Sequence, residues 1–167
     1  PLTEGLGGSI VSAIVPSRTQ AWRVWAALQD GRVVRSDNAG LNWILDDTGL
    51  PSGSGFSHLV AGADGSVYVA VPSGVWRKPS GAMQWSAGTG LPAARISALW
   101  ADPVRANVLV AGVAGSGLYR STDGGASWSA VPVDAASPDI VSIGSAGNRI
   151  VTGTLGSGVA WSDDGGA

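Results

Sequence analysis

Short apolar runs rich in β-branched and aromatic residues alternate with clusters of Gly, Ser, Pro and Asp along the whole chain. Runs of this length and composition are typical of β-strands. No segment carries the apolar stripe with a 3.6-residue period that marks an amphipathic helix. The pattern predicts an all-β fold with strands over residues 10–15, 21–28, 32–36, 42–46, 56–61, 66–71, 75–78, 84–87, 95–101, 107–112, 117–121, 127–131, 139–143, 149–154 and 158–162.

One hairpin motif recurs along the chain and is clearest at residues 120–128. Ser121 and Asp123 carry short side chains that can accept hydrogen bonds from nearby backbone N–H groups, and Gly125 allows the positive φ of a tight turn. Trp128 then begins the outgoing strand as a large apolar anchor. A second copy holds Ser36, Asn38, Gly40 and Trp43, a third holds Ser162, Asp164 and Gly166, and a degenerate copy covers residues 78–85.

The even spacing of these copies indicates a repeat array. The positions 36, 78, 121 and 162 are separated by 42, 43 and 41 residues. Periods of about 40–45 residues are typical of four-stranded propeller blades, and the strand content excludes helical repeats of similar length. The chain is therefore predicted to form one partial β-propeller domain of about four antiparallel four-stranded blades, with approximate bounds 1–47, 48–88, 89–132 and 133–167.

The repeated hairpin resembles the Asp box, or bacterial neuraminidase (BNR) repeat. The whole chain resembles Asp-box β-propellers, a group that includes sialidases, xyloglucanases, sortilin-type receptors and photosystem II assembly factors. In those families the Asp box joins the third and fourth strands of a blade, away from the usual catalytic centre. The resemblance implies structural roles for Ser36, Asn38, Gly40, Trp43, Ser121, Asp123, Gly125, Trp128, Ser162, Asp164 and Gly166.

The resemblance also sets expectations for assembly and location. Family propellers more often have six to eight blades, so we expect a larger or shared ring completed by blades in cis or from a second chain. The chain has no initiator Met, and neither end is a natural blade boundary, so we expect a piece of a longer chain or one part of a shared ring. The family resemblance implies a secreted, envelope or periplasmic bacterial protein.

Charge and composition exclude several function classes. The net charge is −2, no basic cluster is present, and only 13% of residues are charged, which argues against a phosphate-binding nucleic-acid surface. Every apolar stretch is too short to span a membrane. The chain lacks cysteine, which removes disulfides and thiolate metal sites. The sequence predicts no metal and no cofactor.

The candidate ligand face follows from the family resemblance, which places it at the loops between blades and at the turns between second and third strands. The candidate ligand-binding residues are Asp46, Asp47, His58 and Arg95; Asp30, Asp134 and Asp139 lie on the same loops. The alternative interpretation is a set of solvated loop carboxylates and a satisfied histidine. Trp22 and Trp25 either pack between blades or offer a flat surface for stacking on sugars.

A catalytic set is not evident in the sequence. The chain lacks a Gly-x-Ser-x-Gly elbow and a phosphate-binding loop, and Glu4 is the only glutamate. The preferred hypothesis is a non-catalytic propeller scaffold that recognises a protein or glycan through its loop face or open edge. The alternative is a fragment of a sialidase- or xyloglucanase-like glycoside hydrolase whose catalytic residues lie partly outside this chain, with carboxylates such as Asp46 and Asp47 contributing.

The sequence also predicts how three substitutions affect stability. Trp128→Ala is expected to destabilise the protein severely, because it removes a buried ring. Asp46→Ala and His58→Ala are expected to leave stability nearly unchanged, because both residues are assigned to the ligand face.

Overall fold

The computed structural model describes residues 6, 9–53, 55–56, 58–132, 139–147 and 149–163. Within these ranges the chain forms fifteen strands and no helix. The strands are β1 (Val11–Pro16), β2 (Val24–Leu28), β3 (Val33–Ser36), β4 (Ile44–Leu45), β5 (His58–Ala61), β6 (Val67–Val71), β7 (Gly74–Lys78), β8 (Ser86–Ala87), β9 (Ile96–Ala101), β10 (Leu109–Val113), β11 (Gly117–Ser121), β12 (Ser129–Val131), β13 (Ile140–Ala146), β14 (Arg149–Thr154) and β15 (Gly158–Ser162).

The strands form four antiparallel sheets in which sequence neighbours pair. Three sheets have four strands, β1–β4, β5–β8 and β9–β12, and the fourth consists of β13, β14 and β15. This confirms the predicted all-β fold with four repeated blades. Asp164 and Gly166 of the last predicted hairpin lie outside the described residues.

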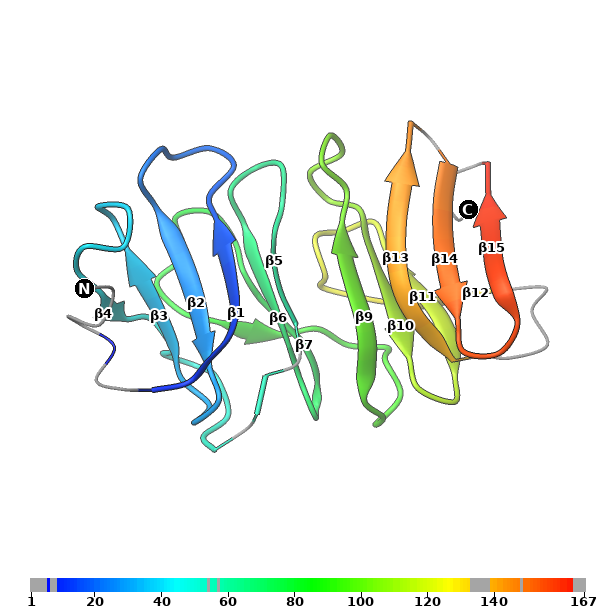
Figure 1. Ribbon diagram of the computed structural model, residues 1–167, viewed down its shortest axis with the longest axis horizontal. Helices are drawn as coiled ribbons and strands as arrows, with labels where there is room; N and C mark the ends of the chain where they lie inside the picture. Colours follow the sequence, from blue (N-terminus) through cyan, green and yellow to red (C-terminus); the bar gives the residue numbers. More distant parts are fainter. Residues whose placement is uncertain are drawn as a thin grey trace.

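The four sheets are arranged side by side around their first strands. β1 packs beside β5, β5 beside β9, and β9 beside β13. In Figure 1 these inner strands occupy the middle of the view, the β1–β4 sheet spreads to the left, the β13–β15 sheet spreads to the right, and the outer strands of the two middle sheets lie behind. The chain therefore forms an open arc of blades with an outer face exposed at each end.

The hydrophobic core lies between successive sheets rather than in one central cluster. Trp25 and Val33 of the first sheet pack with Leu59 and Val69 of the second. Equivalent clusters lie between the second and third sheets and between the third and fourth. The two middle sheets are thus covered on both faces by neighbouring sheets.

A short linker joins each of the first two blades to the next in the same way. Thr48 accepts a backbone hydrogen bond from Trp85 at 2.9 Å, and Thr89 accepts one from Trp128 at 2.9 Å. The following glycine packs so closely that a Cβ on Gly90 would lie 2.3 Å from the Trp128 carbonyl oxygen. Because the Trp85 N–H is bonded to the linker, it is not available for strand pairing. β8 therefore covers only Ser86–Ala87 instead of the predicted strand 84–87.

The predicted strand 21–28 is also shorter in the structure, because its first residues form a turn. Ser17 N–H donates to the Arg23 carbonyl at 2.9 Å, and Trp22 has the left-handed φ of 72°. A bulky residue at such a φ is uncommon and interrupts a strand. β2 consequently begins at Val24.

The two complete repeat hairpins close through the same side-chain contacts. Ser121 Oγ donates to Asp123 Oδ1 at 2.8 Å and accepts from the Gly125 N–H at 2.8 Å. Ser36, Asn38 and Gly40 repeat this pair of contacts. Burial opposes ionisation of Asp123, but hydrogen bonds from Ser127 and Ser121 outweigh it and lower the pKa of Asp123 to about 2. The carboxylate therefore stays ionised and holds its turn closed at neutral pH.

Candidate functional site

The antiparallel topology separates the turns of the sheets onto two sides. The β1–β2 turn and the repeat hairpin of a blade lie at one end of its strands, and the β2–β3 turn lies at the other. We call the second side the loop face and define it by the turns 29–32, 72–73 and 114–116 with the linker residues 46–53, 55–56 and 88–95. The predicted ligand residues of these linkers can therefore be placed against one surface.

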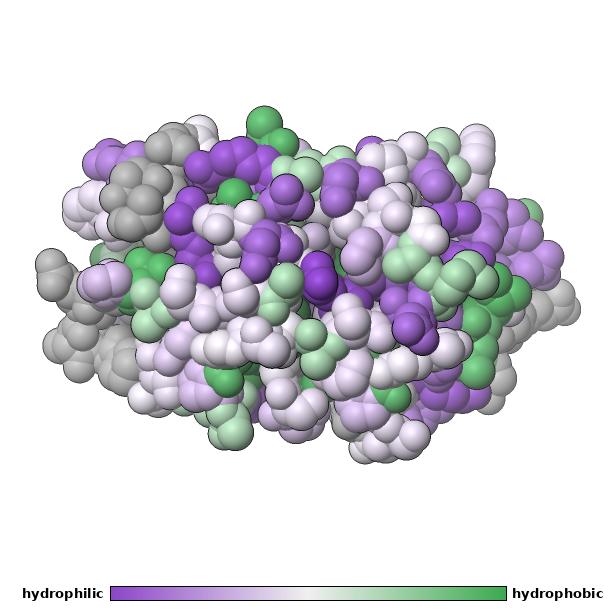
Figure 2. All heavy atoms as spheres, turned by 180° about the vertical axis from the view of Figure 1, so that it is seen from behind, coloured by the Kyte–Doolittle hydropathy of each residue, from purple (hydrophilic) through white to green (hydrophobic). Residues whose placement is uncertain are grey.

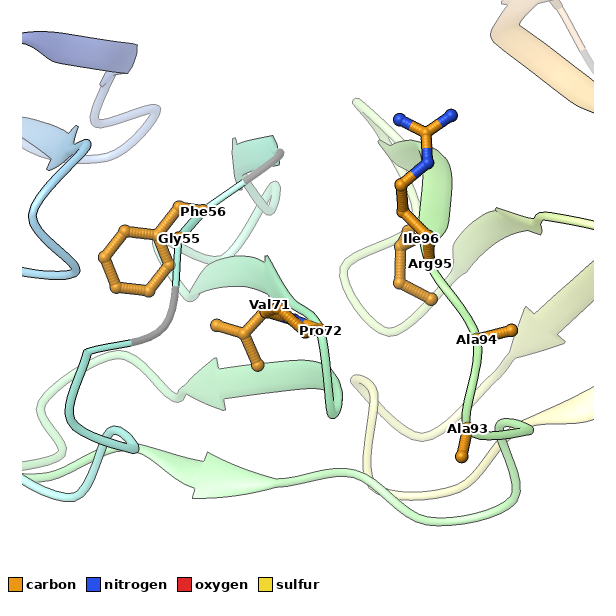
Figure 3. A pocket seen from close by; sticks show the side chains of 8 residues that line it. All are labelled: Gly55, Phe56, Val71, Pro72, Ala93, Ala94, Arg95 and Ile96. Atoms are coloured by element: carbon orange, nitrogen blue, oxygen red, sulfur yellow. The ribbon is translucent and has the colours of Figure 1, made fainter.

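A cavity of about 430 Å³ opens on the loop face between the second and third sheets. The segment before β5, the end of β6 and the linker to β9 contribute its walls, and Figure 3 shows the gap between them. The lining is apolar except for Arg95: Gly55, Phe56, Val71, Pro72, Ala93, Ala94, Arg95 and Ile96. The lining thus combines an apolar surface with one charged side chain.

Arg95 is the charged residue among those that line this cavity. Its side chain is exposed, and its guanidinium extends away from the Ala93–Ala94 segment in Figure 3. Among the ion pairs formed by the described residues, none involves Arg95. A guanidinium in this state presents a planar set of donors to a carboxylate.

His58 lies at the start of β5, where the positive charge of Arg95 affects its pKa. The side chain is half-buried, and its Nδ1 has no hydrogen-bond partner among the residues that the structure describes. Burial, and then the charge of Arg95, lower the pKa of His58 below its usual 6.5. The imidazole is therefore mainly neutral at pH 7. Of the four predicted ligand residues, Arg95 lines the cavity, whereas His58 is not among the residues that line it.

We predict that the imidazole of His58 titrates with a midpoint below pH 6.5. The chain has one histidine, so its NMR signal needs no assignment. Because the folded pKa is lowered, the unfolded state binds more protons below pH 6.5, and His58 reduces stability progressively as the pH falls through that range. His58→Gln is expected to flatten this part of the stability profile. A midpoint at or above 6.5 would contradict the described environment.

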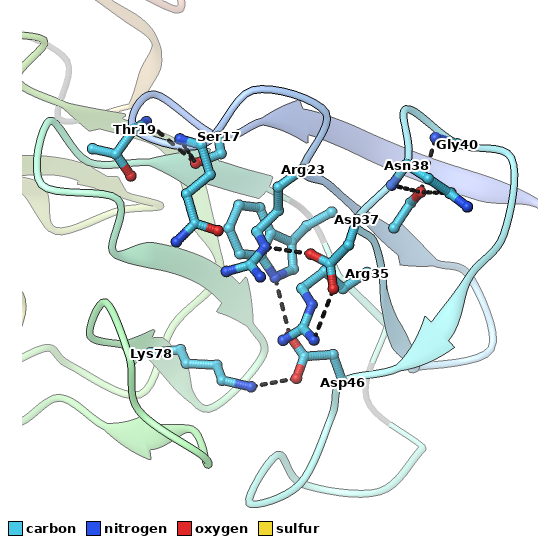
Figure 4. A network of polar contacts seen from close by, with 12 residues as sticks. Ser17, Thr19, Arg23, Arg35, Asp37, Asn38, Gly40, Asp46 and Lys78 are labelled. Carbon is cyan, nitrogen blue, oxygen red and sulfur yellow. Dashed lines mark hydrogen bonds and ion pairs between the residues drawn. The ribbon is translucent and has the colours of Figure 1, made fainter.

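Asp46 occupies a different place from the one expected. It is buried between the first two sheets, where it forms an ion pair with Lys78 and accepts a hydrogen bond from Trp25 Nε1 at 3.0 Å (Figure 4). The alternative of a solvated loop carboxylate is therefore wrong for Asp46. Its effect on stability stays a prediction, and the buried pair reverses the direction that we expect. Lys78 was the feature of the sequence that could have indicated a buried partner for Asp46. It stands at the repeat position that Ser36 and Ser121 occupy in their sheets, where each residue pairs with the first residue of the second strand.

Asp47 lies on the loop face but not in the Arg95 cavity. It lines a smaller hollow of about 190 Å³ together with Asp30 and Arg32. Arg32 Nε donates to Asp30 at 2.8 Å, and this bond lowers the pKa of Asp30. Asp139 accepts from the Gly115 N–H at 2.9 Å, and Asp134 lies outside the described residues.

Four described carboxyl groups have a pKa shifted in the direction opposite to that of an acid catalyst. A glycosidase general acid needs a raised pKa. The pKa is lowered for Asp30, Asp37, Asp102 and Asp123. These groups remain ionised at neutral pH and act as hydrogen-bond acceptors.

The two tryptophans of the second predicted strand have different surroundings. Trp25 is buried between the first two sheets. Trp22 is 71% exposed, and its carbonyl accepts from the Ala39 N–H at 2.7 Å, on the side of the repeat hairpins. Trp25 therefore packs between blades, as one of the two alternatives predicted. Neither the Trp22 ring nor the Trp25 ring lines the Arg95 cavity.

The described residues hold no group of three or more His, Cys, Asp or Glu side chains arranged to bind a metal ion. They also include no helix of the length and hydropathy needed to cross a membrane.

Solved structures show what fold this chain resembles. It matches an ancestral GH74 enzyme over 99% of its length with 23% identity and a TM-score of 0.79, and the GH74 xyloglucanase of Xanthomonas campestris over 93% with 21% identity and a TM-score of 0.73. It spans only 24% and 28% of those two chains. It also matches YCF48 bound to D1 peptide over 94% of its length, at 13% identity, a TM-score of 0.66 and 51% of that chain.

Sequence comparison adds no family to this result. No family model matches the chain, and no curated protein matches it. At these identities the structural likeness concerns the fold alone. The chain therefore has a β-propeller fold, like the GH74 enzymes and other propellers.

Proposed function

We propose that this chain is a non-catalytic β-propeller binding module that recognises an extended peptide segment through the Arg95 cavity of its loop face. The recognised segment combines apolar side chains with a carboxylate, from Asp, Glu or a chain terminus. The observation that carries the proposal is an apolar cavity of about 430 Å³ with a single arginine, which has no ion-pair partner among the described residues.

The chemistry of the cavity favours a peptide over a sugar. Glycan sites usually offer an exposed aromatic ring on which a sugar can stack. The one aromatic residue of this cavity, Phe56, is buried. Small apolar groups and a guanidinium instead suit aliphatic side chains and a carboxylate. YCF48, a propeller solved with a bound peptide, is a precedent for this use of the fold.

We further propose that the repeat hairpins are Asp boxes with a structural role. Their serine and Asp or Asn side chains are occupied by contacts within their own turns. They also lie on the side opposite the loop face.

We place the binding activity outside the cell or in the cell envelope, as the resemblance to Asp-box propellers implies.

A glycoside hydrolase fragment is the second candidate function. The observation that favours it is the pair Asp30 and Asp47, which lines one hollow on the loop face. The lowered pKa of Asp30 opposes a general-acid role for that residue. This candidate therefore needs a general acid other than Asp30.

We predict that Arg95→Ala weakens binding of acidic peptides by about tenfold, the usual cost of losing a hydrogen bond to a charged group. The probe is a panel of fluorescein-labelled decapeptides that combine Leu or Val with Glu, measured by fluorescence anisotropy. Matched peptides with Gln in place of Glu are expected to bind both proteins with the weaker affinity.

Arg149→Ala is the matched control, because Arg149 is exposed on the fourth sheet and pairs with Asp163. It is expected to retain full affinity. Equal affinity of the Glu and Gln peptides for the unchanged chain would refute recognition of a carboxylate. Binding of xyloglucan oligosaccharides without peptide binding would support the second candidate instead.

A further inference from the structure

A second cavity lies between the first two sheets, on the side opposite the loop face. Its volume is about 130 Å³, and its lining includes four charged residues: Arg23, Arg35, Asp46 and Lys78. The hairpin over residues 79–83, which follows β7, forms one wall. Both sheets that enclose this space, β1–β4 and β5–β8, have all four strands. We call it the junction cavity.

The charged head groups at the junction cavity form a network of ion pairs. Lys78 Nζ donates to Asp46 Oδ1, and the two side chains are 9% and 10% exposed. Arg23 Nε donates to Asp37 Oδ1, and Arg35 Nη2 lies 3.1 Å from Asp37 Oδ2. In Figure 4 the head groups of Arg23, Arg35 and Lys78 gather around these two carboxylates. Three cations thus share two carboxylates, which leaves one positive charge in excess.

The two arginines of the network have donors left for a further acceptor. Arg35 Nε is buried and has no hydrogen-bond partner among the described residues. Arg35 Nη1 lies 3.8 Å from Asp46 Oδ2, which is beyond hydrogen-bond distance. The Arg23 guanidinium lies 5.8 Å from the centre of the Trp25 ring, a cation–π contact that holds it at the cavity wall. An acceptor in the cavity would therefore meet guanidinium groups whose positions are already fixed.

Two departures from the repeat make the hairpin wall of the cavity more positive. Lys78 stands where the complete hairpins have Ser36 and Ser121. Ser80, two residues further on, stands where the hairpin of the third sheet has Asp123, and it lines the cavity. The first departure adds a cation and the second replaces a carboxylate with a hydroxyl. The degenerate hairpin therefore differs from the complete copy of the third sheet in the direction that favours an anion.

The junction between the second and third sheets lacks the buried charges. Arg77 is the repeat arginine there, and its Nε is likewise without a partner among the described residues. Gly88 takes the place of Asp46, because the N–H of each donates to the third strand of its sheet in the same way. Ser121 takes the place of Lys78. Blade packing alone thus does not require the charges of the junction cavity.

The size of the junction cavity limits what it can hold. One water molecule takes up about 30 Å³ in the liquid, so the cavity has room for roughly four. Pockets for larger organic ligands have volumes of about 300–1,000 Å³. The junction cavity therefore suits a small ion, or one charged group of a larger ligand, and not a whole sugar ring or peptide segment.

We propose that the junction cavity binds a tetrahedral oxyanion, phosphate or sulfate, as a free ion or as the ester group of a larger ligand. Guanidinium groups bind such oxygens through paired N–H donors. Arg23 and Arg35 supply these donors, and the excess positive charge balances the anion. The oxygens of Asp46 accept from Lys78 Nζ and Trp25 Nε1, so its charge is already compensated.

This site is separate from the peptide site proposed above, and neither depends on the other. The junction cavity lies on the side of the repeat hairpins, whereas the Arg95 cavity opens on the loop face. The hairpin side is uppermost in Figures 1 and 2, and Figure 2 shows strongly hydrophilic residues mainly in the upper half of the view. A charged ligand would therefore approach the hairpin side over a polar surface.

The test is a titration of the ¹⁵N-labelled 167-residue chain with inorganic phosphate, followed by NMR at constant ionic strength with sodium chloride as the balancing salt. The expected result is a saturable shift of the Nε–H signals of Arg23 and Arg35 and of the amides of 80–83. Arg23→Gln is expected to weaken phosphate binding by about tenfold, the usual cost of losing a hydrogen bond to a charged group. Its circular dichroism is expected to stay unchanged, because the pair with Asp37 is partly exposed.

Arg149→Gln is the matched control, because Arg149 takes the place of Arg23 in the fourth sheet and pairs with Asp163 there. It is expected to keep full affinity. Inorganic sulfate is expected to compete with phosphate. Glucose 6-phosphate separates the two sources of the oxyanion: tighter binding than inorganic phosphate would identify an ester ligand, and equal or weaker binding would identify the free ion.

Two results would overturn the proposal. One is a set of shifts that chloride alone reproduces at the same ionic strength, because such shifts would report general screening of the arginines. The other is equal phosphate affinity of the unchanged chain and the Arg23→Gln protein.

Discussion

Replacing Trp128 with alanine is expected to lower the free energy of unfolding by about 3–5 kcal/mol, the usual cost of truncating a buried aromatic ring. Trp128 is buried in the cluster between the second and third sheets. Its backbone N–H also donates to Thr89 of the linker, and the backbone at Gly90 packs against its carbonyl. The substitution therefore leaves a cavity at the junction of two blades. Urea denaturation followed by fluorescence or circular dichroism measures the loss.

Trp22→Ala is the control for this prediction, because it removes the same side chain from an exposed position. Its effect is expected to stay within about 0.5 kcal/mol, as for most surface substitutions. Denaturation midpoints that coincide for Trp128→Ala and the unchanged chain would contradict the structural role of the outgoing-strand tryptophan.

Asp46→Ala is expected to cost about 3–5 kcal/mol, because it leaves the ammonium group of Lys78 buried without its partner. Both side chains are buried at the interface of the first two sheets. The loss also frees Trp25 Nε1 from its hydrogen bond to the carboxylate. Urea denaturation is suitable here, since urea does not screen charges.

Asp37→Ala supplies the comparison for the Asp46 variant. Asp37 also pairs with arginines, Arg23 and Arg35, but its carboxylate is exposed. Exposed pairs contribute at most about 1 kcal/mol.

The double variant Asp46→Leu with Lys78→Met is expected to regain most of the lost stability, because both buried charges are absent. An Asp46→Ala protein as stable as the Asp37→Ala protein would show that the buried pair contributes little.

The blade architecture was predictable because it depends on local signals that repeat. The spacing of Ser36, Lys78, Ser121 and Ser162 gave the period, and β-branched runs gave the strands. Strand ends were less predictable. Trp22 interrupts the second strand through its backbone conformation, and Trp85 gives its N–H to Thr48 of the preceding linker. Neither event follows from hydrophobic pattern or local propensity.

The candidate site was predictable only in part. Family-guided placement of the loops put Arg95 and His58 on one face, but only Arg95 lines the cavity. The cavity beside Arg95 depends on how the linker 93–95 packs against the end of β6, which is a long-range contact. Asp46 was misplaced because its partner, Lys78, is 32 residues away and marks a departure from the repeat.

The central claim, recognition of an acidic peptide in the Arg95 cavity, is tested most directly by amide NMR of the ¹⁵N-labelled chain during titration with an unlabelled Leu- and Glu-containing decapeptide. The expected result is a saturable shift of the amides of 93–96, of Val71 and of 73–74, and of the Arg95 Nε–H. Shifts confined to the repeat hairpin 121–128, or no shift at saturating peptide, would contradict the claim.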